Sequence, residues 1–278
     1  MHWILVLPYA LILLVSAIIA ASVSTIAWSR CDTGSCKAFS LGMAFIYLWN
    51  FAGALEASVI EPGIKIFLSQ IAYIGIVNTP PTMLVFILLY TRRVKRLRLR
   101  LAVLLWIAPI IVLLLTWSNA WHGLVWPGFK YGSRELNILI YEHGPGFWTL
   151  MAFTNLYDLI IAVILLRELR HSQGRYRSQV IVMLIGASIP AFAGVLYAFG
   201  VNLAPGLDLV SISSVLSGVM FAIGIFRFDI LNLVPIARAV LLEQLQDGIV
   251  VLDTGMCIID LNFSAKIILN DDKGPLLN

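Results

Sequence analysis

Few side chains in this sequence could bind a ligand or take part in acid–base chemistry, and most of them lie near the ends of long apolar segments. Glu56 follows Trp49 by seven residues, which is two helical turns, so both side chains share one helix face. A carboxylate in a bilayer is costly unless it reaches a partner, water or the interface. Glu56 is therefore a candidate for sensing, although it could instead lie at the outer surface beside Lys65.

His122 and Asp158 each have two interpretations. His122 lies in a loop among tryptophans, where a histidine either binds a ligand or belongs to an interfacial aromatic belt. Asp158 lies well inside an apolar segment, where only burial against a donor makes a carboxylate tolerable. The sequence does not identify that donor, so structural and functional roles stay open for Asp158.

The residues predict no metal, cofactor or catalytic site. Cys31 and Cys36 are separated by four residues and have no histidine in the same loop, so two ordinary thiols are favoured over a metal site. No glycine-rich phosphate loop is present, and His171 lies in a short basic loop. We therefore expect neither autophosphorylation nor cyclic dinucleotide synthesis by this chain.

The composition predicts a membrane protein with several spans. Of 278 residues, 60% are hydrophobic and only 12% are charged, and the mean hydropathy is +0.92. Soluble domains average about 25% charged residues, so one water-facing core cannot hide this much apolar surface. The net charge of +4 comes from residues in loops between apolar segments, which favours a role in membrane orientation over nucleic-acid binding.

Seven apolar segments are long enough to cross a bilayer core, which needs about 20 helical residues. They predict an all-α bundle of seven transmembrane helices. The segments are Ile4–Ala27, Ala38–Ile60, Ile66–Tyr90, Leu101–Trp117, Phe147–Leu166, Val180–Phe199 and Leu209–Phe226.

The positive residues predict which loops face the cytoplasm. Fourteen Lys and Arg residues fall on one side of the seven segments and three on the other. Because cytoplasmic loops carry the excess of positive charge, the N-terminus is expected outside and the C-terminus in the cytoplasm. Cys31 and Cys36 would then lie in a reducing compartment.

With this orientation, polar and aromatic side chains from separate segments fall at one depth near the outer surface. A mostly apolar wall with a few polar groups is typical of a ligand pocket. The predicted ligand-binding residues are Trp49, Glu56, Gln70, Tyr73, Asn119, His122, Trp126 and Asp208.

The pattern changes after the seventh segment. Pro235 precedes a short, mostly apolar helix over Ile236–Leu245. Ile249–Leu252 and Cys257–Ile259 predict two strands around a turn at Asp253–Gly255. Asp260 to Asn262 could cap a helix over Phe263–Leu269, since short polar side chains accept hydrogen bonds from free amides.

Along residues 1–240 the sequence resembles the N-terminal seven-transmembrane sensor region of bacterial and archaeal histidine kinases. The residues after 246 resemble the start of a PAS domain. The matching residues are Trp49, Glu56 and Lys65; Tyr73-Ile-Gly75, Pro80 and Tyr90; Asn119, His122 and Trp126; Gly146-Phe147 and Asp208; Asp229-Ile-Leu and Val234-Pro-Ile-Ala-Arg238; and Asp247-Gly248, Val251-Leu-Asp253, Asp260 and Asn262.

The resemblance implies a sensor domain at 1–228, a cytoplasmic connector helix at 229–246 and an incomplete α/β PAS-like segment at 247–278. It also implies a homodimer in the lipid bilayer. A PAS domain needs on the order of 100 residues, so a tail with half a core should be marginally stable.

The leading functional hypothesis is a signal-input module of a two-component or related receptor. It would detect a small molecule or an envelope condition and pass the change through the seventh helix. The output would be a histidine kinase or a diguanylate cyclase that this sequence does not contain. The alternative is a small transporter or channel, which would require inverted repeats and ionisable residues near the membrane midplane. Only Asp158 fits the alternative.

Overall fold

The computed structural model describes residues 7–30, 33–131, 139–198, 210, 213, 216–217, 220, 247–252 and 258–268. The chain divides into two units, Met1–Leu231 and Asn232–Asn278. The expected boundaries of the connector helix lie outside the described residues.

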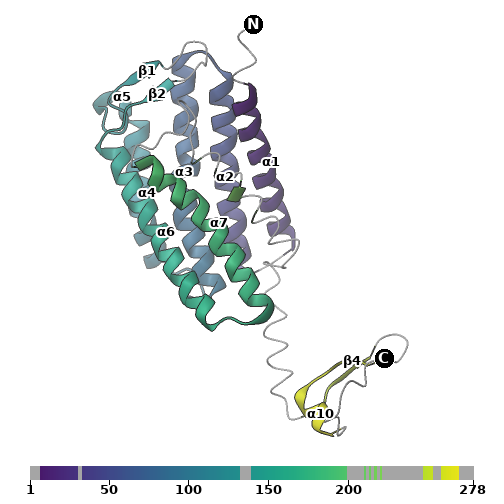
Figure 1. The fold of residues 1–278 in the computed structure, drawn as a ribbon. Helices are drawn as coiled ribbons and strands as arrows, with labels where there is room; N and C mark the ends of the chain where they lie inside the picture. Colours follow the sequence, from purple (N-terminus) through teal and green to yellow (C-terminus); the bar gives the residue numbers. More distant parts are fainter. Residues whose placement is uncertain are drawn as a thin grey trace. The chain divides into compact units, whose positions relative to one another are not determined.

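The first unit contains six long helices that lie side by side (Figure 1). Each begins and ends within a few residues of one of the first six predicted spans, which confirms those predictions. The seventh predicted span lies almost entirely outside the described residues. The six helices are α1 (Leu7–Arg30), α2 (Gly34–Ser58), α3 (Pro62–Tyr90), α4 (Leu99–Trp117), α6 (Pro145–His171) and α7 (Gly174–Ala198).

All six helices are long and apolar enough to cross a membrane. Large aliphatic side chains stay exposed along their outer faces, such as Ile18 on α1, Leu104 on α4 and Leu159 on α6. In a bilayer these faces contact acyl chains, which are as apolar as leucine, so their exposure carries no hydrophobic penalty.

Helix α2 packs between α1 and α3, and small residues allow the close approach. A Cβ atom placed on Gly75 of α3 would lie 2.4 Å from the carbonyl oxygen of Phe45 and 2.8 Å from the amide nitrogen of Trp49. On the other side, Ser24 of α1 and Ser40 of α2 donate to each other's carbonyl oxygens at 2.8 and 2.7 Å. Small residues at helix contacts are a common feature of membrane bundles.

Polar side chains tie the remaining helices together. The indole of Trp106 on α4 donates to Asn78 on α3 at 2.7 Å, and the Tyr157 hydroxyl on α6 donates to the Leu105 carbonyl of α4 at 2.8 Å. Tyr90 at the end of α3 donates to Gln179 of α7 at 3.0 Å. These bonds satisfy groups for which lipid offers no partner.

A described residue of the seventh predicted span contacts the bundle. The Ser217 hydroxyl is buried and donates to the Gly186 carbonyl of α7 at 3.0 Å. The Gly186 position thus receives a polar side chain from the next segment of the chain.

A short helix and a hairpin lie between α4 and α6, at one end of the bundle (Figure 1). Helix α5 (Asn119–His122) ends at Gly123, whose φ of 61° lies in the left-handed region that favours glycine. Strand β1 (Phe129–Tyr131) pairs antiparallel with β2 (Leu139–Tyr141), and Phe129 lies opposite Tyr141.

The second unit contains the predicted order of strand, strand and helix. Strand β3 (Val250–Leu252) pairs antiparallel with β4 (Ile258–Leu261), and α10 (Phe263–Ile268) follows. Asn262 caps this helix because its side-chain oxygen accepts from the Ala265 amide at 2.9 Å. The same oxygen accepts from the Ile249 amide at 2.8 Å, which joins the cap to the start of β3.

The Cys36 sulfur is disulfide-bonded, so it is not the free thiol expected from the sequence. Disulfide bonds are rare in the cytosol. The compartment that the loop before α2 faces therefore stays a prediction.

The Gly75 contact predicts the effect of a single methyl group. We expect Gly75→Ala to lower the free energy of unfolding by about 1–3 kcal/mol, because overpacking against backbone atoms forces α2 and α3 apart. Gly194→Ala on α7 is the matched control, since its Cβ would meet no atom of a described residue within 4 Å. Thermal unfolding in a mild detergent would compare them, and equal melting temperatures for the two variants would contradict the prediction.

Candidate functional site

The carboxylate of Glu56 anchors a chain of hydrogen bonds near the C-terminal end of α2. The Tyr141 hydroxyl of β2 donates to Glu56 Oε1 at 2.6 Å. Tyr141 has a single hydroxyl proton, so Ser69 of α3, whose Oγ lies 2.6 Å from the same hydroxyl, donates to Tyr141. The chain Ser69, Tyr141, Glu56 connects α3, the hairpin and α2, and its last bond is strengthened by the carboxylate charge.

Lys65 provides a buried cation beside this carboxylate. Only 4% of Lys65 is exposed, and its Nζ donates to the backbone carbonyl of Glu56 at 2.8 Å. That carbonyl lies in the last turn of α2, where the helix dipole favours positive charge. Lys65 thus stabilises the end of α2 and offsets the charge of Glu56 at the same position.

Aromatic rings cover the polar chain. Trp126 is 3% exposed, and its ring contacts Tyr73 edge to face at a centroid distance of 5.1 Å. Trp126 also lies 5.1 Å from the Tyr141 ring, and Phe129 meets Tyr141 edge to face at 5.5 Å. The cluster offers an apolar aromatic wall next to a carboxylate and an ammonium group.

Asn119 holds the loop that carries Trp126. Its side-chain oxygen accepts from the amides of Val125 and Trp126 at 2.9 and 3.0 Å, and its amide group donates to the Trp126 carbonyl at 3.0 Å. Asn119 is buried. Its role in this structure is to position the Trp126 ring over Tyr73.

His122 is exposed and bonds within its own loop. Its Nδ1 accepts from the Leu124 amide at 2.9 Å, so in the neutral ring the proton is on Nε2. Nε2 lies 3.0 Å from the Ser118 hydroxyl, which donates its own proton to the Leu114 carbonyl. The network therefore assigns one tautomer, and the described contacts keep the ring on the loop and away from Glu56.

The other predicted site residues lie at different positions. Gln70 donates to the Thr116 carbonyl at 3.2 Å and links α3 to α4. Trp49 is half-buried at the close contact between α2 and α3, two turns from Glu56. Asp208 lies outside the described residues.

The loop that carries Trp126, residues 123–128, is called the aromatic loop. It is joined directly to α6. The amides of Gly144 and Gly146 donate to the carbonyls of Val125 and Leu124 at 3.0 and 2.8 Å. A Cβ on Gly144 would lie 2.2 Å from the Leu124 carbonyl oxygen, so only glycine allows this approach. These contacts hold the aromatic loop against the first turn of α6.

A second aromatic group connects this region to α7. The His143 ring stacks on Phe147 at 3.7 Å, and His143 Nε2 lies 2.8 Å from the Tyr197 hydroxyl. The loop before α6 and the C-terminal end of α7 are thus held together by a polar contact and by ring packing.

Tyr141, Ser69 and His143 were not among the site residues predicted from the sequence. Tyr141 and Glu56 are 85 positions apart, so no local spacing joins them. The sequence signal for Tyr141 is its residue type alone, because a buried tyrosine hydroxyl usually has a hydrogen-bond partner.

Asp158 remains without an assigned role. It lies in the middle of α6, and no hydrogen bond or ion pair joins it to a described residue. Within the described ranges, no three His, Cys, Asp or Glu side chains gather closely enough to hold a metal ion.

The fold and its lipid-facing surface define the class: a multi-pass helical membrane protein whose polar contacts gather between its helices and in the hairpin end. The family model that describes the N-terminal 7TM region of histidine kinase matches residues 12–235, and the chain belongs to this family. Its transmembrane part is therefore a membrane sensor module and is not itself catalytic. A comparison with curated proteins finds no match.

The family assignment confirms the resemblance seen in the sequence for the transmembrane region. The PAS-like tail and the relation to diguanylate cyclases stay predictions, as does the membrane orientation.

The Tyr141 bond predicts a loss of stability at high pH. Burial, and then the neighbouring Glu56 carboxylate, raise the pKa of the Tyr141 phenol above its ordinary value of 10.0. A raised pKa in the folded state contributes stability that is present below pH 10 and lost as the pH rises further. We expect the melting temperature in detergent to fall above pH 10, and Tyr141→Phe to reduce this fall.

Below pH 10 the Tyr141→Phe variant should be less stable by about 1–3 kcal/mol, since it removes a hydrogen bond to a charged group. Tyr47→Phe on α2 is the control. A pH profile of Tyr141→Phe that matches the unmodified protein would contradict this account.

Proposed function

We propose that the chain is the input module of a signalling protein and that its outer polar cluster, made of Glu56, Lys65, Ser69 and Tyr141, is the site at which the signal acts. The single observation that supports this most is the Tyr141 to Glu56 hydrogen bond, which joins a solvent-side hairpin to a membrane helix. A ligand that donates to Glu56 would compete with Tyr141 and release the hairpin.

The chemistry of the cluster favours a particular kind of signal. The Glu56 carboxylate accepts from Tyr141, whose ring packs against Trp126. The Lys65 ammonium group bonds the backbone carbonyl of the same Glu56. A small molecule with hydrogen-bond donors and a flat apolar part would satisfy both surfaces. An envelope condition that moves the hairpin would act on the same bond without a ligand.

The relay is proposed to run through two connected elements. The aromatic loop accepts backbone hydrogen bonds from the start of α6, and the Ser217 contact joins the seventh segment to α7. A signal only needs to favour one helix arrangement over another, and each tenfold preference supplies about 1.4 kcal/mol. The output is proposed to be a cytoplasmic histidine kinase or diguanylate cyclase, reached through the connector helix in a homodimer.

The Glu56 hypothesis can be tested in a chimera that carries a working output domain. We expect Glu56→Gln to change basal output or to shift the dose response roughly tenfold, because a neutral amide weakens the bond from Tyr141. His122→Ala tests the wider predicted pocket. Glu142→Gln is the matched control, since that carboxylate pairs with Lys130 at the surface.

Membrane insertion of each variant would be checked by its amount in the membrane fraction. Unchanged basal output and dose response for both Glu56→Gln and His122→Ala would place the signal elsewhere. Asp158→Asn would then be the next variant.

Orientation needs a test that does not rely on the native cysteines, because Cys36 is disulfide-bonded. In a chain with its three cysteines changed to serine, we expect Trp121→Cys to react with an impermeant maleimide in intact cells. Trp121 is 90% exposed at the hairpin end. Arg96→Cys should react only after permeabilisation, and the opposite pattern would reverse the proposed orientation.

A further inference from the structure

The loop between α3 and α4 carries the densest charge in the described part of the chain. Residues 92–100 contain six Lys or Arg residues and no carboxylate, in the sequence RRVKRLRLR. All six cations are exposed, and none forms an ion pair with a described residue. Like charges this close repel one another within a Debye length of about 8–10 Å, so the loop favours a bound anion.

The start of α4 adds to this preference. Its N-cap residue is Arg98, which provides no side-chain acceptor, and its first turn contains no acidic residue. The positive end of the helix dipole is therefore surrounded by more positive charge instead of being neutralised. The membrane orientation of a helix depends on the number of cations in its loops. It does not explain why these cations surround the start of α4.

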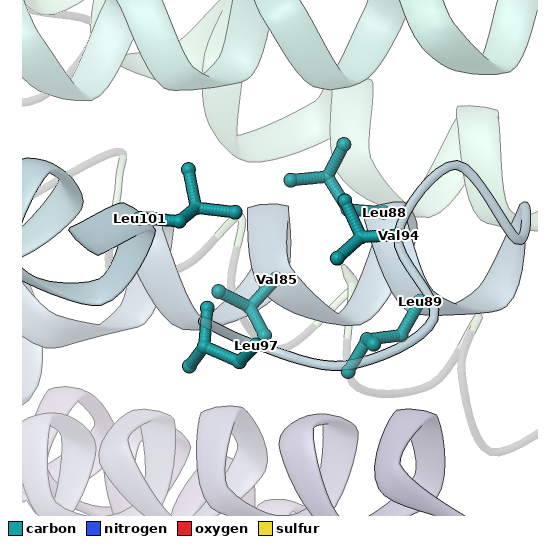
Figure 2. A pocket seen from close by; sticks show the side chains of 6 residues that line it. All are labelled: Val85, Leu88, Leu89, Val94, Leu97 and Leu101. Atoms are coloured by element: carbon teal, nitrogen blue, oxygen red, sulfur yellow. The ribbon is translucent and has the colours of Figure 1, made fainter. Parts of the chain in front are cut away.

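The apolar residues of the same loop hold these cations in place. Figure 2 shows six aliphatic side chains that enclose a shallow hollow, in which there is no room for a water molecule. Two of them, Val94 and Leu97, come from the loop itself. The amide of Val94 donates to the Leu88 carbonyl at 3.2 Å, which folds the chain back onto α3. The hollow is lined by Val85, Leu88, Leu89, Val94, Leu97 and Leu101.

The surface next to the loop is apolar and faces lipid. Leu99, Val103 and Leu104 of α4 are 80, 54 and 66% exposed. A fixed group of cations therefore lies at the end of an exposed aliphatic helix face. This is the arrangement that a phospholipid requires, with its phosphate at the cations and its acyl chains along the helix.

We propose that the α3–α4 loop and the first turns of α4 form a binding site for an anionic phospholipid. Arg93, Lys95 and Arg96 contact the headgroup phosphate, and Leu99 and Val103 contact the acyl chains. The site does not depend on the proposed sensing cluster or on which leaflet the loop faces.

Native mass spectrometry of the purified full chain in detergent tests the proposal, with phosphatidylglycerol and phosphatidylcholine as probes. We expect phosphatidylglycerol to bind at least roughly tenfold more tightly, because each surface cation contributes about 1 kcal/mol toward anionic lipid. The triple variant Arg93→Gln, Lys95→Gln, Arg96→Gln should lose this preference.

The matched control removes three exposed cations from the end of α6 and the start of α7. Its changes are Arg167→Gln, Arg170→Gln and Arg177→Gln. It should keep the preference for phosphatidylglycerol. An equal loss in both triple variants would indicate a diffuse field and overturn the proposal, as would equal binding of the two lipids. Displacement of the lipid by glycerol phosphate at similar concentration would also overturn it, since the site would then bind soluble anions.

A second variant separates the lipid site from membrane orientation. Leu97→Asn keeps every charge but weakens the packing that holds the loop. It should lower phosphatidylglycerol affinity severalfold, and undiminished affinity would contradict the proposed role of the hollow. If maleimide labelling shows that the triple variant is inverted, the affinity of Leu97→Asn decides the question.

Discussion

The close backbone contact at Gly75 holds α2 and α3 in one relative position. Gly75 brings the backbone of α3 against Phe45 and Trp49 of α2, so the two helices cannot shift without a clash. Glu56 near the end of α2 and Lys65 and Ser69 near the start of α3 are therefore held at fixed separations. Only then can one hydroxyl, that of Tyr141, reach both Glu56 and Ser69. The aromatic loop packs against Tyr141 through Trp126, so its position depends on that of Tyr141.

The helices could be predicted from the sequence because lipid imposes a length and a composition on each span. Local chemistry was also readable, as at Asn262, where a polar residue before an apolar run caps α10. The candidate site was predicted only in part. Glu56, Tyr73 and Trp126 come together, because depth in the membrane can be counted along each helix. Asn119 and His122 were predicted at the same depth, but their side chains bond within their own loop. Depth along the membrane normal does not specify which way a side chain points.

What the sequence could not provide is the pairing of distant polar groups. Tyr141 reaches Glu56 only because β1 and β2 form a hairpin, and the turn that places it is not marked by a periodic pattern. The orientation of His122 is decided by two hydrogen bonds to its neighbours. The disulfide at Cys36 also could not be predicted from the sequence. Positive charges predict the compartment of a loop only through a statistical preference.

The bond from Tyr157 to the Leu105 carbonyl has a mechanical consequence. It fastens α6 to α4 near the middle of α6, twelve residues from Pro145 and fourteen from His171. At 1.5 Å per residue, each arm is about 20 Å long. A rigid helix that is fastened near its centre can pivot about that point, and its two ends then move by similar distances in opposite directions. An outward tilt of its first turn, pulled by the aromatic loop, would swing its last turn inward by the same distance.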